Sequence, residues 1–190
     1  MASASEDRAV TGTAWFSAAA CAVLAVAVPA NGVMPKLLLW NASASVPIGL
    51  YALRSADNPE ISDLVVVVPP EPLAAYLAER GYLAPGVPLL KRVAALPGQK
   101  VCRNVLTISV DGAPLGRARE RDGGNRILLT WQGCRVLSEV EVFLMNWQAA
   151  DSFDGRYFGP IPRSAIIARA VPLWTDEAGD GRFVWRAATR

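Results

Sequence analysis

The sequence contains no histidine among its 190 residues. Histidine is the base of the Ser-His-Asp and Cys-His pairs and a frequent zinc ligand, so its absence excludes those pairs and most zinc sites built on imidazole. Any general base must be Lys, Asp, Glu or Tyr. Lysine is scarce as well, because the chain carries it only at Lys36, Lys91 and Lys100. Nothing in the sequence calls for a metal or a cofactor.

The sequence also has little net charge, which is only +2. Its one dense charge run, RARERD at 117–122, mixes both signs, and we interpret it as a solvated turn. We therefore expect no nucleic-acid partner. Apolar residues make up 52% of the chain, which is enough for one well-packed catalytic or binding domain.

Charge is missing altogether between residues 9 and 35. A helix needs about 20 predominantly apolar residues to cross a bilayer, and this stretch is longer than that. We therefore expect residues 1–35 to form a cytoplasmic tail and one N-terminal transmembrane helix.

A cleaved secretory leader is the alternative interpretation of the same stretch. Residues 14–28 would be its apolar core, and AVA at 25–27 would be its cleavage site. We favour the membrane anchor because apolar residues continue past that site as far as Met34. Both interpretations place residues 36–190 outside the cytosol.

Beyond the apolar segment, short runs rich in Val, Ile and Leu alternate with turn residues. DLVVVVPP at 63–70 is a β-branched run closed by two prolines, which is typical of a buried strand. PLAAYLAERG at 72–81 has helical spacing and a terminal glycine, which predicts one short helix. Strands at this spacing indicate an all-β sandwich or barrel-like body. The other predicted strands lie at 87–96, 105–112, 126–131, 139–146 and 165–174.

Three cysteines are present. Cys21 lies in the apolar segment, where we interpret it as a small packing residue. Cys102 and Cys134 lie in the exported part, where oxidising conditions allow a disulfide bond. We predict that these two are bridged, and two buried free thiols are the alternative.

Two serines, Ser43 and Ser45, precede a Pro-x-Gly turn in NASASVPIGLY, residues 41–51. Such clusters are usual in chain reversals. A serine hydroxyl becomes a good nucleophile only when a neighbouring base takes its proton, and without histidine the best remaining base is a neutral lysine. Lysine is neutral near pH 7 only where burial lowers its pKa by several units.

Lys91 is the lysine that best meets this demand. It lies in GVPLLKRVAALPG, where strand alternation places its ammonium among apolar neighbours. Lys36 lies at the edge of the predicted membrane segment, and Lys100 follows a PGQ turn. The alternative is an exposed strand edge with the heads of Lys91 and Arg92 in water, and these residues alone leave both interpretations open.

Three segments, SASVP, LLKRVAALPGQKV and DSFDGRYFGPIP, decide in favour of the buried lysine. Their order and rough separations resemble those of the type I signal peptidase superfamily of Ser-Lys serine peptidases, from the apolar segment to about Trp174. The pattern of Pro47, Gly49 and Tyr51 is most similar to its conjugative-transfer branch, the TraF-type pilin-processing peptidases. This resemblance implies a mainly β fold with a signal-peptidase-like antiparallel β-body.

Carried over by position, the resemblance implies that Ser45 is the catalytic nucleophile and Lys91 the general base. Ser43 matches the position whose hydroxyl forms the oxyanion hole together with the backbone N–H of Ser45. Ser152 matches the serine that hydrogen-bonds and orients the lysine.

Asp154 and Arg156 match a supporting ion pair in the last segment of the resemblance. The sequence also departs from the general pattern, since Pro47 follows the nucleophile by two residues rather than three. MNWQAA at 145–150 replaces an expected Gly-Asp-Asn-Arg run, and Gly155 stands where a serine is common. These departures favour the conjugative branch over a general signal peptidase.

The function implied by the resemblance is that of a membrane-anchored endopeptidase with a Ser-Lys dyad. It would sit in the bacterial inner membrane as a single-pass protein, with its peptidase domain (36–174) on the periplasmic side and a charged tail at 175–190. Its substrate would be a conjugative pilin precursor or another exported protein, and its other partners the lipid bilayer and a conjugative secretion system. Some members of this branch join the trimmed pilin into a ring, so cyclisation is a further expectation.

Three alternatives remain at this point. A general type I signal peptidase would remove export leaders. A LexA-like self-cleaving regulator shares the Ser-Lys pair and the β fold, but the apolar N-terminus and the lack of a DNA-binding helical domain argue against it. A non-catalytic secreted β domain would use Ser45 as a turn residue and Lys91 as a surface residue.

Overall fold

The computed structural model describes residues 15–21, 23 and 37–188. Contacts divide the chain into two units, Met1–Lys36 and Leu37–Arg190. In the first unit, residues 15–21 and 23 are helical, and the rest of the predicted anchor at 1–35 lies outside the described residues. Within the part of the chain that is described, no helix is both long and apolar enough to span a bilayer.

The second unit is mainly β structure. Its helical segments are α2 (Glu71–Glu79), α3 (Gly155–Phe158) and the 3-10 turn Arg163–Ala165. Its strands are β1 (Leu38–Asn41), β2 (Ile48–Arg54), β3 (Leu64–Val67), β4 (Leu89–Ala95), β5 (Lys100–Asn104), β6 (Thr107–Val110), β7 (Ala113–Arg117), β8 (Gly133–Val136), β9 (Glu141–Leu144), β10 (Ile161–Pro162), β11 (Ile166–Asp176) and β12 (Val184–Trp185).

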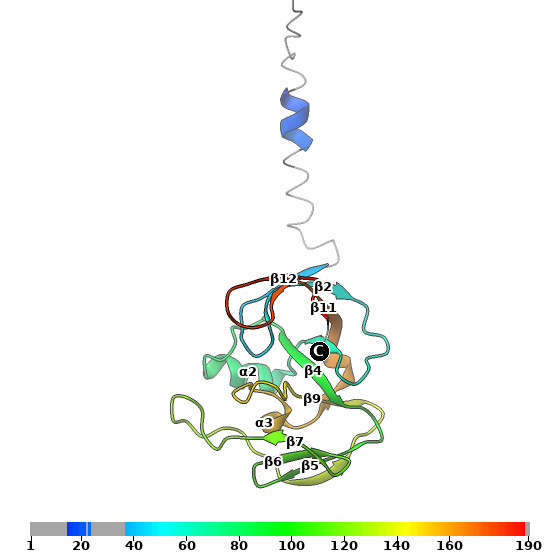
Figure 1. Ribbon diagram of the computed structural model, residues 1–190, viewed down its shortest axis with the longest axis vertical. Coiled ribbons are helices and arrows are strands. Elements are labelled where there is room, and N and C mark those ends of the chain that lie inside the picture. Colours follow the sequence, from blue (N-terminus) through cyan, green and yellow to red (C-terminus); the bar gives the residue numbers. More distant parts are fainter. Residues whose placement is uncertain (1–14, 22, 24–36, 189–190) are drawn as a thin grey trace, which may run out of the picture. The chain divides into compact units, whose positions relative to one another are not determined.

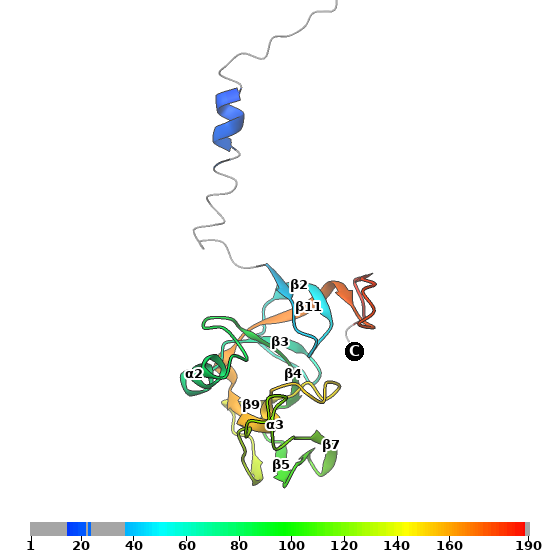
Figure 2. The same cartoon turned by 90° about the vertical axis from the view of Figure 1, so that its left-hand side faces the viewer.

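These strands form two sheets. The larger has the order β1-β2-β11-β3-β4-β9-β10, with β12 paired to β11, and the smaller has the order β7-β6-β5-β8. Neighbouring strands pair antiparallel in both, which confirms the predicted antiparallel β-body. Figures 1 and 2 show β5 and β7 at the opposite end of this unit from β2 and β11.

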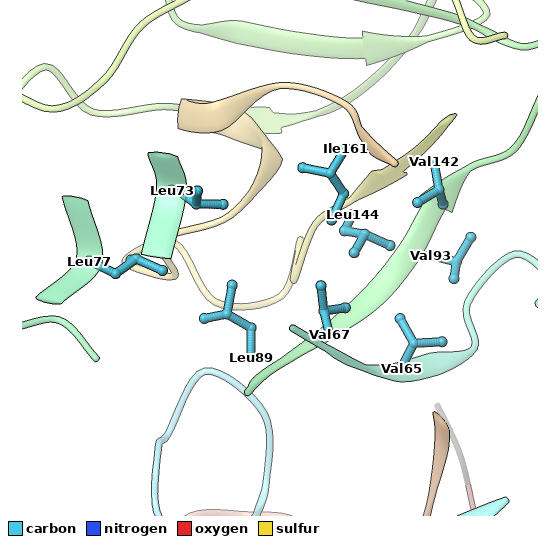
Figure 3. Close-up of a cluster of buried hydrophobic side chains, with 9 residues drawn as sticks. All are labelled: Val65, Val67, Leu73, Leu77, Leu89, Val93, Val142, Leu144 and Ile161. Atoms are coloured by element: carbon cyan, nitrogen blue, oxygen red, sulfur yellow. The ribbon is translucent and has the colours of Figure 1, made fainter. Parts of the chain in front are cut away.

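Strand β3 lies at the centre of the larger sheet, between β11 and β4, and all four of its residues are buried. This position explains why its sequence is a continuous β-branched run without alternation. Leu73 and Leu77, one helical turn apart on α2, lie in the same core cluster as Val65 and Val67 of β3. Figure 3 shows side chains from α2, β3, β4, β9 and β10 pointing toward one another in one core cluster.

Most of the elements predicted from the sequence are present with shifted ends. The helix predicted at 72–81 is α2, and the strands predicted at 63–70, 87–96 and 139–146 are β3, β4 and β9.

The strand predicted at 126–131 is wrong. Of those residues only Ile127 forms a β bridge, an isolated one with Arg121. Side chains rather than a backbone ladder hold this apolar run, since Leu128 packs with Tyr157 and the Trp131 indole donates a hydrogen bond to the carbonyl of Gly155 at 2.9 Å.

Beyond residue 174 the chain continues as ordered structure. Strand β11 extends to Asp176, and β12 folds back to pair with it. Phe183 lies between Trp40 and Trp174, with ring centroids 6.1 and 4.6 Å away. The charged segment at 175–188 therefore docks on the larger sheet.

A disulfide bond joins Cys102 of β5 to Cys134 of β8, which confirms the predicted bridge. The two residues are direct partners in the antiparallel register of the smaller sheet. The bond closes a loop with a sequence separation of 32.

Candidate active site

Ser45 lies in the turn between β1 and β2, and the side chain of Asn41 holds this turn together. The Asn41 amide donates hydrogen bonds to the carbonyls of Ser43, Val46 and Pro47 at 2.7, 3.2 and 3.0 Å. Its oxygen accepts from the backbone N–H of Ser43 at 3.1 Å. One side chain at the last residue of β1 thus satisfies several backbone groups of the loop that carries the predicted nucleophile.

The structure explains the Pro-x-Gly-x-Tyr pattern by two contacts, one made by Tyr51 and one by Gly49. The Tyr51 hydroxyl is a second anchor for the turn, donating to the Pro47 carbonyl at 2.6 Å. Burial raises the pKa of Tyr51, so it stays a hydroxyl donor. Gly49 has a φ of +146°, and a Cβ there would lie 2.2 Å from the carbonyl oxygen of Trp174. Only glycine allows β2 and β11 to approach this closely.

Lys91 lies in the middle of β4 with 4% of its surface exposed, so the predicted burial of this lysine is correct and the exposed-edge alternative is wrong. Its ammonium donates a hydrogen bond to the Ser152 hydroxyl at 2.9 Å. Burial lowers the pKa of Lys91 to about 8, an effect that the charge of Arg156 reinforces and that of Asp154 opposes. The neutral form of this lysine is therefore more accessible near physiological pH than that of a lysine in water.

Asp154 and Arg156 form a buried ion pair, with exposed fractions of 0% and 1%. The contact is bidentate, because Nε and Nη2 of Arg156 lie 2.8 and 2.7 Å from the two carboxylate oxygens. Arg156 also donates to the carbonyls of Ala149 and Ala150 at 2.6 and 3.3 Å. The pair thus fixes the loop that leads into Ser152.

The glycine at position 155, where the general pattern has a serine, is explained by packing. A Cβ on Gly155 would lie 2.6 Å from the Leu144 carbonyl and 2.7 Å from the Phe143 ring. The β9 strand packs too closely on the start of α3 for any side chain here.

Ser45 and Lys91 line one cavity of about 750 Å³. Ser43, Ser152 and Asp151 line it as well, and its apolar wall includes Leu77, Leu83, Val87, Leu89, Leu128 and Phe153. In the described part of the chain no hydrogen bond joins Lys91 to Ser45. Catalytic contacts are often longer in an enzyme without substrate and tighten in the complex.

The charge run at 117–122 is largely exposed, as the interpretation of a solvated turn expects, since Arg117, Arg119, Glu120 and Arg121 all face solvent. Arg119, Arg121 and Asp122 line the same cavity. Asp122 accepts a hydrogen bond from the hydroxyl of Tyr82, which ties this loop to the segment after α2.

Ser43 and Ser45 contact one another at the cavity wall. The Ser45 backbone N–H donates to the Ser43 hydroxyl oxygen at 3.4 Å, and the Ser43 hydroxyl donates to that of Ser45 at 3.3 Å. Among the described residues no group of His, Cys, Asp or Glu side chains gathers that could hold a metal ion. The donors nearest to the Ser45 hydroxyl are thus the Ser43 hydroxyl and the Ser45 backbone N–H, and both bond within the loop in this structure.

The structure brings together all of the site residues predicted from the sequence in one unit of the chain. Lys91 bonds the Ser152 hydroxyl, and Arg156 of the ion pair bonds the Ala149 carbonyl, which also accepts from the Ser152 N–H. Ser43 and Ser45 line the same cavity as Lys91 and Ser152. Sequence reasoning missed Asn41, although it opens the NASASVP segment at the end of a strand, where a capping carboxamide is common.

Comparison with known proteins identifies the family of the chain. The family described as "Signal peptidase, peptidase S26" matches residues 12–174. The chain belongs to this family. Peptidase S26 members are serine peptidases, so membership implies that this chain is a serine peptidase too.

Within the S26 family, the chain is similar to TraF proteins. It is 37% identical over 147 residues to the conjugal transfer protein TraF of Agrobacterium tumefaciens (strain 15955), covering 71% of this chain and 81% of that protein. It is 33% identical over 144 residues to a plasmid transfer protein TraF of Escherichia coli, with coverage of 71% and 81%. These relatives confirm the resemblance to the TraF-type branch.

A crystal structure of a signal peptidase I from Enterococcus faecalis V583 is also similar. It is 19% identical, with a TM-score of 0.36, and the match covers 60% of this chain and 98% of that chain.

Proposed function

We propose that this S26 peptidase is a membrane-anchored endopeptidase that uses Ser45 and Lys91 to process a pilin precursor during conjugation. The observation that carries the proposal is a lysine with 4% exposure that lines the same cavity as Ser45. A lysine in a surface role would keep its ammonium in water. The printed names of the relatives, conjugal transfer and plasmid transfer protein TraF, support the conjugative setting over a general signal peptidase.

In the first step, the neutral amine of Lys91 removes the proton from the Ser45 hydroxyl. The resulting alkoxide attacks the carbonyl carbon of the scissile peptide bond. The hydrogen bond from Lys91 to Ser152 keeps the amine directed into the cavity while the proton is transferred. Lys91 then gives the proton to the leaving amine, which completes acylation of Ser45.

The oxyanion that forms in this step needs hydrogen-bond donors. The Ser45 backbone N–H and the Ser43 hydroxyl, which contact one another, are the donors beside the nucleophile. A single donor of this kind is typically worth about 10²- to 10³-fold in rate. Ser43 therefore contributes strongly but is not indispensable.

The acyl-enzyme on Ser45 has two chemical fates. Water gives a linear product, and an amine held beside the ester gives a new peptide bond. A tethered amine has a high effective concentration, so capture by the substrate's own N-terminus would release a cyclic pilin. Lys91 can accept the proton of either nucleophile.

Placement beside the inner membrane, with the cavity on the periplasmic side, is part of the proposal. Trp40, Trp174 and Trp185 are 51%, 45% and 63% exposed on β1, β11 and β12. Tryptophan is enriched at the membrane interface, and β1 follows the predicted anchor directly. Trp40 also lines the cavity, so a substrate held in the bilayer would enter near this surface.

The test uses donor cells in which the gene for this peptidase is disrupted. The mass of the intact transfer pilin is measured in these cells after complementation. Cells complemented with the wild type should contain trimmed pilin, and those with Ser45→Ala only the precursor. Ser55→Ala is the matched control, because Ser55 is exposed and bonds only Asp57. Trimmed pilin in the Ser45→Ala cells would contradict the proposal. A product lighter than the linear chain by one water would identify cyclisation.

A further inference from the structure

Asn146 is a buried residue immediately after β9 whose side chain reaches across to β4. It is 2% exposed. Its amide donates to the Leu90 carbonyl at 3.1 Å, and its oxygen accepts from the Arg92 backbone N–H at 3.0 Å. These two backbone groups flank Lys91 on either side. The Asn146 carboxamide therefore holds the β4 backbone on both sides of Lys91, whose side chain lines the cavity.

These two hydrogen bonds from Asn146 take the place of backbone bonds that a longer β9 would make to β4. The pairing of β4 with β9 reaches Val93, and Met145 N–H then donates to the Arg92 carbonyl at 2.9 Å. Beyond that bond the chain turns away, and the Asn146 side chain serves the next two backbone groups of β4. Leu90 and Arg92 are buried, so losing both bonds would leave two backbone groups unpaired away from water, which is unfavourable.

The backbone of Asn146 is fixed in turn by the buried ion pair. Its N–H donates to Asp154 at 3.0 Å, and its carbonyl accepts from Arg156 at 3.2 Å. The same ion pair fixes the loop before Ser152, which binds the ammonium of Lys91. Both ends of Lys91 are thus held through one ion pair, the backbone end by way of Asn146 and the ammonium end by way of Ser152.

We propose that Asn146 is a positioning residue for Lys91, whose carboxamide holds the β4 backbone so that the amine stays buried and directed at the cavity. The proposal rests on the proposed function for the role of Lys91 as a base. It extends that function by naming the contact that keeps the base in place.

Substitution of Asn146 by alanine changes no charge near Lys91. The charged groups around the lysine are Asp154 and Arg156 on the ion-pair side and, on the wall of the cavity, Asp151, Arg119, Arg121 and Asp122. The Arg92 guanidinium bonds the Ser62 carbonyl. A change in Lys91 ionisation would therefore report a change in its position and burial.

The test is an NMR titration of the full chain in detergent micelles, labelled with lysine carrying ¹³C at Cε. The chain has three lysines, so the Lys91 signal can be assigned with Lys91→Arg. In Asn146→Ala, the loosened strand should admit water and raise the Lys91 midpoint by roughly one pH unit or more. The rate of Ser45 acylation by N-acetylalanine p-nitrophenyl ester should fall about tenfold or more.

Gln132→Ala is the matched control. The Gln132 carboxamide forms the same kind of backbone bridge at an exposed site beside the smaller sheet, where it accepts from Val105 N–H at 3.0 Å and donates to the Val105 carbonyl at 3.1 Å. This variant should leave both readouts unchanged. A folded Asn146→Ala protein with the wild-type midpoint and acylation rate would overturn the proposal. Because the titration needs no activity, a wild type that is never acylated would count against the proposed function and leave the positioning result standing.

A second variant covers the case in which Asn146→Ala does not fold. In Asn146→Asp the side chain keeps its shape and can accept from Arg92, but an ionised carboxylate cannot donate to Leu90. The added charge itself raises the Lys91 pKa, so acylation is compared at the alkaline plateau of each protein. A plateau about tenfold below wild type supports positioning, and an equal plateau overturns it.

Discussion

At the scale of single residues, the site depends on a lysine that folding keeps out of water. Its apolar neighbours in LLKRVAAL left burial and an exposed strand edge both open, and the resemblance to the Ser-Lys peptidases favoured burial. In the structure every residue of β4 is buried, and this keeps the lysine out of water. Asn41 and Asn146 were not predictable in the same way. Their carboxamides act on backbone groups, and those bonded by Asn146 lie 54 and 56 residues away, which no local pattern reveals.

Lys91→Arg should be as inactive in pilin processing as Lys91→Ala, with a loss of roughly 10²- to 10⁴-fold. The reason is that a guanidinium is protonated at every working pH and cannot act as a base. Lys100→Arg, at an exposed strand end, should keep full activity and serves as the control. The measurement is the rate of precursor conversion, and processing by Lys91→Arg would remove Lys91 from its role.

Asn41→Ala should slow Ser45 acylation by roughly 10²-fold while leaving the protein folded. The alanine removes the bonds to the carbonyls of Ser43, Val46 and Pro47, and a misplacement of about 1 Å at a nucleophile costs about this much. Asn104→Ala, an exposed change at the end of β5, is the control. An unchanged acylation rate in folded Asn41→Ala protein would show that the turn is held by other contacts.

At the scale of elements, the sequence predicted the strands with long apolar runs, and it missed β2 and β5, which are partly buried, as well as the exposed β8. The run LVVV of β3 is fully buried and was recognised, whereas GCRV of β8 is exposed throughout and shows no alternation. The apolar run at 126–131 was mistaken for a strand because Leu128 and Trp131 are used for side-chain anchoring. Apolar composition marks burial, and only long-range pairing decides whether a buried segment joins a sheet.

Gly49→Ala should destabilise the protein by roughly 2–4 kcal/mol, because its Cβ would meet the Trp174 carbonyl at 2.2 Å where β2 pairs with β11. Gly112→Ala is matched for positive φ, but its Cβ would meet nothing within 4 Å. It should cost only the conformational strain, about 1 kcal/mol. Denaturant unfolding of both variants measures the difference, and equal losses would contradict the packing argument.

At the scale of the whole molecule, the two sheets have different tasks. The larger sheet and its loops carry Ser45, Lys91 and the exposed Trp40, Trp174 and Trp185, and the smaller sheet is closed by the disulfide. Of the residues that the resemblance assigns to the site, Ser43, Ser45, Lys91 and Ser152 line one cavity. The resemblance ends at about Trp174, so it did not indicate that β12 returns to pair with β11. Phe183, directly before β12, packs between Trp40 and Trp174, which belong to the distant strands β1 and β11.

Removal of the Cys102–Cys134 bond by the double substitution to serine should lower the free energy of unfolding by about 2–4 kcal/mol. Peptidase activity at low temperature should persist, because neither cysteine lines the cavity. Cys21→Ser is the control, since that thiol is free. Reductant should reproduce the loss in the wild type and leave the double variant unchanged; a reductant effect on the double variant would point to another cause.

The central claim is that neutral Lys91 activates Ser45, and the pH dependence of Ser45 acylation tests it most directly. The rate of labelling by N-acetylalanine p-nitrophenyl ester is followed by mass spectrometry of the peptide that contains Ser45, in the wild type and in Lys91→Ala. Because the amine must lose its proton to act, the wild-type rate should rise about tenfold per pH unit up to a midpoint near 8 and then level off. Lys91→Ala should show neither the rise nor appreciable labelling. Label on another serine, or a rise with the same midpoint in Lys91→Ala, would contradict the account.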